Sequence, residues 1–79
     1  MRTIVVITLY EGLLHEVLTF HDSPEGREKA ERTFRKEASR MCHRVVDQAV
    51  LDLIDAGLKA GSFRGDDGAV YIRETELVG

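Results

Sequence analysis

The sequence has few of the residues that cross-link a small protein, insert it into a membrane or attract it to nucleic acid. Its single cysteine, Cys42, excludes an internal disulfide, and a chain of this kind is typical of the reducing cytoplasm. No apolar run approaches the roughly 20 residues that a membrane-spanning helix needs. The net charge of −3 gives no overall attraction to nucleic acid or to an anionic membrane. We therefore expect a cytoplasmic protein that does not enter a membrane.

The residue patterns that catalysis and cofactor binding require are also missing. There is no dinucleotide fingerprint or catalytic triad, and the segment FRGDDGA at 63–69 matches neither a calcium loop nor a phosphate loop. Cys42 and His43 are neighbours that would point about 100° apart on a helix, so they form neither a metal site nor a nucleophile–base pair. We therefore predict no enzymatic activity, no cofactor and no metal.

What the sequence does contain is the composition of one small folded domain. Its 79 residues are 43% hydrophobic and 32% charged, which is ordinary for a globular protein. At this length a single core stabilises a fold only modestly. No linker or internal repeat divides the chain, and we expect one domain over residues 1–79.

Two strands joined by a tight turn are predicted first. Residues 3–10 are mostly β-branched and aromatic, as in a strand, and a second apolar run covers residues 13–21. The two-residue loop between them ends in Gly12, which is typical of a hairpin. With this loop, Val6 lies opposite Val17. The first strand is apolar on both faces, which predicts a central position in the sheet.

A helix is predicted over residues 23–58 and a last strand over residues 69–78. Asp22 or Ser23 can cap the helix, and Pro24 suits its first turn. A helix that packs back across the sheet delivers the last strand antiparallel to the first. The predicted fold class is therefore α+β, with a ββαβ layout and a three-stranded antiparallel sheet of order 2-1-3.

The predicted helix is too long for this sheet. It would span about 50 Å, whereas strands of eight residues span about 26 Å. Its first half carries an apolar stripe through Phe34 and Met41, and its second half carries a broader stripe that is rotated around the helix. This rotation indicates either a second packing partner or a kink near residues 41–44. Since no proline or glycine lies between residues 27 and 56, we favour a continuous helix.

The second stripe and the second apolar face of the sheet predict a homodimer. Small monomers rarely expose such patches, and the two-fold dimer is the commonest closed assembly. We expect Leu53 and Ile54 to be buried, with at least one of Val50, Leu53 and Ile54 in contact with the partner chain. The predicted dimer interface consists of Val46, Val50, Leu53 and Ile54.

A ridge of basic residues offers a different function. Lysines and arginines recur at a spacing of three or four residues opposite the first apolar stripe, and such a ridge can follow phosphates. Glutamates are interleaved with them, and no aromatic side chain is present for base stacking, so a solvated helix face is the favoured interpretation. The ridge consists of Lys29, Arg32, Lys36, Arg40 and Arg44.

The hairpin VVITLYEGLLHEVLTF, followed by an acidic helix start, resembles small uncharacterised prokaryotic and phage proteins that open with a strand, a glycine turn and a strand. The resemblance covers residues 4–20 and implies no activity and no site residue. Ribbon–helix–helix repressors are of similar size but carry one strand and two helices, so they do not match. We expect a homodimer that acts by binding, as a regulatory or accessory module. The alternative is a nucleic-acid-binding regulator that uses the basic ridge.

Overall fold

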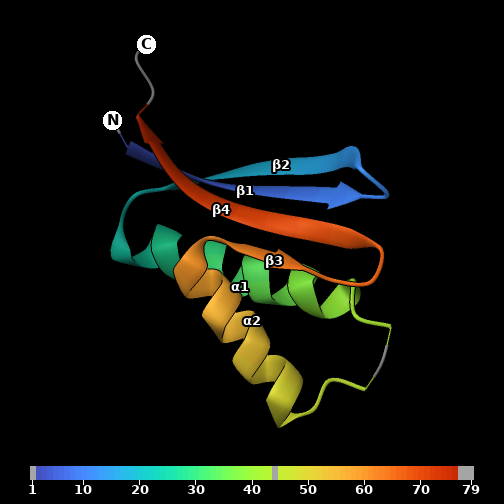
Figure 1. The fold of residues 1–79 in the computed structure, drawn as a ribbon. Helices are drawn as coiled ribbons and strands as arrows, with labels where there is room; N and C mark the ends of the chain where they lie inside the picture. The colour runs from blue at the N-terminus through green and yellow to red at the C-terminus, as the bar shows by residue number, and fades with distance from the viewer. Residues whose placement is uncertain (1, 44, 77–79) are drawn as a thin grey trace.

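The structure, a computed structural model, describes residues 2–43 and 45–76. Its elements are β1 (Arg2–Tyr10), β2 (Leu13–His21), α1 (Pro24–Arg40), α2 (Gln48–Ala60), β3 (Ser62–Arg64) and β4 (Gly68–Glu76). One antiparallel sheet of four strands in the order β2-β1-β4-β3 lies over both helices (Figure 1). The α+β class is therefore confirmed, but the layout is ββααββ and the predicted ββαβ layout is wrong.

The N-terminal hairpin forms where the sequence predicts it. Glu11 and Gly12 occupy the turn with φ angles of 52° and 78°, the positive values that a two-residue hairpin loop requires. β1 pairs with β2 on one side and with β4 on the other, so its predicted central position is confirmed.

The predicted register of this hairpin is wrong beyond the turn. Val6 lies opposite Leu18 instead of Val17, because the pairing shifts between Thr8 and Leu9. One extra residue of β2, His15, is accommodated there as a β-bulge. Because strand side chains alternate between faces, this shift exchanges the faces of Val17 and Leu18. Leu18 thus shares the helix-covered face with Val6, and Val17 lies on the opposite face.

The continuous helix predicted over residues 23–58 is also wrong, and the break falls where a kink was the alternative. Asp47 ends the linker and caps α2, its carboxylate accepting a hydrogen bond from the Val50 backbone N–H at 3.0 Å. At the other side of the break, the end of α1 is held by contacts with residues distant in the sequence. The Asp66 backbone N–H donates to the Met41 carbonyl at 2.8 Å, and the Met41 side chain is buried in the core. The break therefore needs no proline or glycine within the linker itself.

β3 lies between the predicted helix over residues 23–58 and the predicted strand over residues 69–78, where no strand is predicted. Gly61 ends α2 with a φ of 93°, the left-handed conformation that suits a helix terminus. Ser62, Phe63 and Arg64 then pair with residues 69–71 of β4. The predicted order 2-1-3 is thereby extended by one edge strand. The predicted last strand is β4, and residues 77–78 of that prediction lie outside the described residues.

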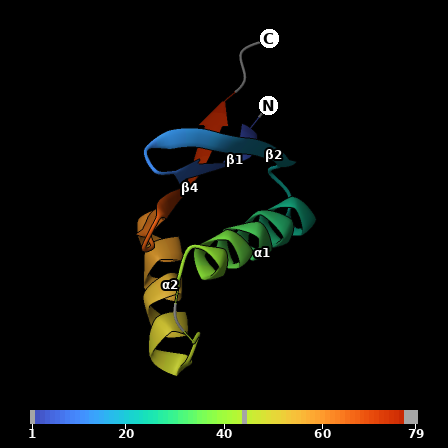
Figure 2. The same ribbon diagram turned by 90° about the vertical axis from the view of Figure 1, so that its right-hand side faces the viewer.

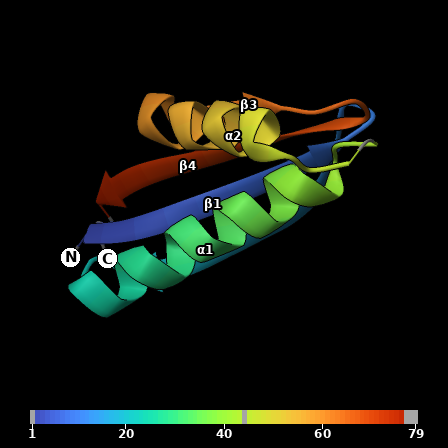
Figure 3. The ribbon, with the colours of Figure 1, turned by 90° about the horizontal axis from the view of Figure 1, so that it is seen from below.

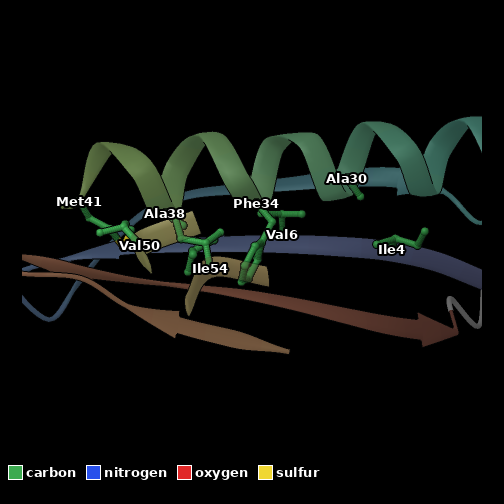
Figure 4. Packing of buried hydrophobic residues seen from close by; sticks show 9 residues of the cluster. Ile4, Val6, Ala30, Phe34, Ala38, Met41, Val50 and Ile54 are labelled. Carbon is green, nitrogen blue, oxygen red and sulfur yellow. The ribbon is translucent and has the colours of Figure 1, made fainter. Parts of the chain in front are cut away.

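The core lies between the sheet and α1, with a contribution from α2 (Figure 4). The first apolar stripe packs as predicted, since Phe34 and Met41 are buried against the inner face of the sheet. Figure 2 shows both helices on this one side of the sheet, and no helix or strand of the described residues lies on the other. The core residues are Ile4, Val6, Ala30, Phe34, Ala38, Met41, Val50, Ile54 and Val70.

Candidate functional site

The predicted dimer stripe on α2 is divided between the interior and the surface. Val50 and Ile54 are only 3% and 1% exposed and belong to the core of the chain itself. Leu53 is 54% exposed and Val46 is 37% exposed. Burial of Ile54 is therefore confirmed. Leu53 is exposed within the single chain because α2 meets the core along one side only, so its predicted burial stays a prediction that depends on the partner chain. Contact of this stripe with a partner stays a prediction, carried by Val46 and Leu53.

The predicted basic ridge on α1 is partly neutralised by carboxylates of the same helix. Arg32 forms an ion pair with Glu28 at 3.0 Å, and Arg40 forms one with Glu37 at 3.4 Å. Pairs of this kind on a helix surface add little stability, but they lower the positive potential that a phosphate would meet. Of the remaining ridge residues, Lys29 and Lys36 are exposed, and Arg44 lies outside the described residues.

The face of the sheet opposite the helices forms an apolar surface. At its centre is β1, whose side chains at Val5, Ile7 and Leu9 are half-buried between the neighbouring strands. The register places apolar side chains of β2 and β4 on either side of them. We name this set the outer apolar face: Val5, Ile7, Leu9, Leu14, Val17, Ala69 and Tyr71.

Polar residues surround the outer apolar face. An apolar centre inside a polar rim is the usual anatomy of a protein–protein interface. None of the outer-face positions in the four strands is an aspartate or a glutamate, and the guanidinium of Arg73 lies 5.7 Å from the centre of the Tyr71 ring. The rim consists of Thr3, Thr19, His21, Ser62, Arg64, Arg73 and Thr75.

The accessible surface of the whole chain is larger than its mass predicts. It amounts to 5435 Å², whereas a folded monomer of this mass exposes about 4,800 Å². The excess is about 600 Å² and approaches the roughly 800 Å² that each partner contributes to an interface of standard size. A sheet face without a covering layer is one contribution to such an excess.

The sequence analysis identified this surface in part. It predicted that the first strand has two apolar faces and that the second face needs a cover. It placed Leu18 where Val17 lies, because it did not include the bulge at His15. The polar pair His15-Glu16 within an apolar strand was the available signal for that bulge.

A groove separates α1 from α2 on the inner side of the sheet. Figure 3, seen from below, shows β1 and β4 between the two helices. The groove has a volume of about 710 Å³, and its apolar lining comes from Ile4, Leu58 and Ile72. Its charged lining consists of Arg27, Glu31, Arg35, Asp55, Lys59, Arg73 and Glu74.

Ion pairs join the elements around this groove. Arg35 of α1 contacts Asp55 of α2 at 3.2 Å. Arg27 of α1 donates hydrogen bonds to Glu74 of β4 and to Asp22, which lies just before α1. These hydrogen bonds raise the pKa of Arg27 above its usual value. One pair therefore connects α1 to α2, and the other connects α1 to β4.

His43 ties the linker between the helices to the turn between β3 and β4. Its Nε2 lies 2.9 Å from the Asp67 carboxylate, and its backbone N–H donates to the Asp66 carboxylate at 2.7 Å. The hydrogen bond to Asp67, together with the negative charge of that carboxylate, raises the pKa of His43 above its usual value. This contact supports the break between α1 and α2.

Within the described residues, no three histidine, cysteine, aspartate or glutamate side chains converge on a point that could hold a metal ion. Neither α1 nor α2 is long and apolar enough to cross a membrane. The outer apolar face and the groove each have a shape and a chemistry suited to binding. Comparisons with models of known protein families, with curated proteins and with solved structures found no match.

Proposed function

We propose that this chain is a homodimeric binding module of the cytoplasm, assembled by packing the outer apolar faces of two copies against each other. It acts by binding, as a regulatory or accessory protein. The observation that carries the proposal is the uncovered apolar face. A sheet that is apolar on both sides needs a cover on both sides, and the two helices cover only one.

A two-fold arrangement satisfies both the packing and the charge of this face. Two sheets that pack face to face lie about 10 Å apart with interdigitated side chains, and the helices of both copies then point outward. A two-fold axis parallel to the strands lays β2 of one copy over β4 and β3 of the other. Arg64 and Arg73 then lie opposite β2 of the other copy instead of opposite their own copies, so like charges are kept apart.

The test compares two glutamate substitutions at side chains of similar exposure. Val17 is 48% exposed on the outer apolar face, and Leu53 is 54% exposed on α2. A monomer should tolerate both Val17→Glu and Leu53→Glu. We expect sedimentation equilibrium at micromolar concentration to show dimers for the wild type and Leu53→Glu, and a folded monomer for Val17→Glu. A monomeric wild type would refute the proposal, and dissociation by Leu53→Glu alone would move the interface to the α2 stripe.

The nucleic-acid-binding regulator remains the alternative function. Two observations support it. Lys29 and Lys36 are exposed and form no ion pair with a described residue, and α1, which carries them, faces solvent in the proposed dimer. A titration with mixed DNA and RNA at low salt tests it, because phosphate contacts weaken steeply as salt rises. Charge reversal at Arg32, Lys36 and Arg40 together should abolish any binding. Absence of binding at low salt would remove this alternative.

A further inference from the structure

β4 continues past the end of β3 and leaves an unpaired strand edge. β3 pairs only with residues 69–71 of β4, whereas β1 pairs along the other side of β4 as far as Glu76 (Figure 1). The Ile72 backbone N–H still donates to the Gly61 carbonyl at 3.0 Å. Because alternate residues of a strand direct their backbone groups to the same side, the N–H and C=O of Glu74 also point to this edge. No described strand pairs with them there.

The groove between the helices adjoins this unpaired edge. Its lining includes Ile72, Arg73 and Glu74 of β4, together with residues 58–61 at the end of α2. A strand added at the edge would direct every second side chain toward the inner side of the sheet, where Leu58 and Ile72 supply apolar surface. The volume of about 710 Å³ lies within the range of about 300–1,000 Å³ that is usual for ligand sites.

Arg73 lies at the place that an added strand would occupy. Its guanidinium donates to the Gly61 carbonyl at 3.2 Å and to the Ile72 carbonyl at 3.4 Å. Both bonds are exposed, and an exposed hydrogen bond of this kind exchanges readily with another donor. Charged side chains are one way in which proteins shield an open sheet edge from unwanted pairing.

The charges beside the edge favour an acidic partner. Arg27 and Arg35 are already ion-paired with carboxylates that line the groove. Lys59 and Arg73 form no ion pair with any described residue, and both line the groove. A carboxylate of a bound segment would therefore find two cations that no described carboxylate neutralises.

We infer that this edge binds an extended segment of a partner protein by strand addition. The backbone of the segment pairs with residues 74–76 of β4, its alternate apolar side chains enter the groove, and an acidic residue lies against Lys59 and Arg73. Main-chain hydrogen bonds supply affinity, and the groove selects the side chains. The inference rests on the proposed role as a binding module but not on the dimer. The groove and the outer apolar face lie on opposite sides of the sheet, and Arg73 is the one residue that both lines the groove and belongs to the rim of that face.

The experiment selects ligands from a phage-displayed library of random decapeptides and maps their site by NMR on the labelled protein. We expect the selected peptides to alternate apolar residues and to carry an acidic residue. They should shift the amide signals of residues 72–76 and leave those of β2 unchanged. Selection of no peptide, or shifts confined to the β2 edge, would overturn the inference.

Two variants of Glu74 separate backbone pairing from side-chain effects. Glu74→Pro removes an N–H that points away from β1, a position at which an edge strand tolerates proline. It should weaken peptide binding about tenfold, the effect of one or two lost hydrogen bonds. The matched control Glu74→Gln keeps the N–H, loses the same ion pair with Arg27 and should bind nearly as the wild type does. Equal affinity of the two variants would contradict strand addition.

Further variants keep the inference testable if Glu74→Pro does not fold. Lys59→Glu lies on α2, leaves every strand unchanged and should lower the affinity for acidic peptides several-fold, an effect that high salt should diminish. Val17→Glu should bind the peptides as the wild type does, whatever its state of association. Loss of peptide binding in Val17→Glu would show that the site needs the dimer and would refute the inference as stated.

Discussion

The two faces of β1 are similar in sequence but differ in their surroundings. Ile4 and Val6 point toward α1 and α2 and are fully buried, whereas Val5 and Ile7 point to the uncovered side and are half-buried. Both helices follow β2 in the chain and lie on the same face of the sheet. The difference shows that an apolar pattern identifies a face that needs a cover without identifying which molecule supplies it.

The largest effect is expected on the inner face. Phe34 is fully buried beneath the sheet, and Phe34→Ala should destabilise the fold by about 3–5 kcal/mol, since it removes a large side chain and leaves a cavity. Urea unfolding followed by circular dichroism measures this loss. The control Lys36→Ala, on the exposed side of the same helix, should change stability by less than about 0.5 kcal/mol. A small loss for Phe34→Ala would mean that the inner face is not the core.

A matched pair in β1 compares the two faces directly. Ile4→Ala should cost about 2–5 kcal/mol at every protein concentration, because its contacts lie within one chain. Ile7→Ala should act through the proposed dimer: the melting temperature of the wild type rises with protein concentration, and the variant should lose this rise. Thermal unfolding over a hundredfold range of concentration makes the comparison. A wild type whose melting does not depend on concentration would show that the outer apolar face has no partner copy.

A second pair of substitutions lies on α2, and the one at the exposed residue should change the unfolding free energy less than the one at the buried residue. Ile54→Ala should cost about 2–5 kcal/mol, and Leu53→Ala should change the unfolding free energy by no more than about 0.5 kcal/mol. The reason is that Ile54 is buried within the chain and Leu53 is not. Urea unfolding at low and high protein concentration checks both. If both variants lost the same unfolding free energy, and the loss increased with protein concentration, a partner chain would have to contact α2.

The smallest effect concerns pH and the linker that joins the two helices. Asp67 raises the pKa of His43 in the folded state, so the contribution of this contact is complete below the unfolded pKa of about 6.5 and is lost as the pH rises through the folded value. The wild type should therefore lose stability relative to His43→Gln on going from pH 5.5 to pH 8.5. Urea midpoints of both proteins at the two pH values measure this difference. Asp67→Asn should remove it, and identical pH dependence of wild type and His43→Gln would contradict it.

The candidate sites were predictable from the sequence only in part. Two-sided apolarity of β1 indicated an uncovered face, but the residues of β2 on that face depend on a bulge that shifts the register by one residue. The groove was not predicted, because it exists only where α1 and α2 are separate helices on one sheet. The unpaired edge of β4 likewise depends on the short β3 strand, which has no clear apolar alternation of its own.

The sequence by itself determined the elements whose signals are local. The β-branched run with Gly12 specified the first hairpin, and Ser23 with Pro24 specified the start of α1, where the Ser23 hydroxyl accepts from the Gly26 backbone N–H at 3.0 Å. Only the tertiary structure decided the break between the helices, the bulge and the fourth strand. Each of these depends on partners distant in the chain, such as Met41 with Asp66 and residues 62–64 with β4. A periodicity measured along the chain does not contain those contacts, because it records which face of an element is apolar and not what packs against that face.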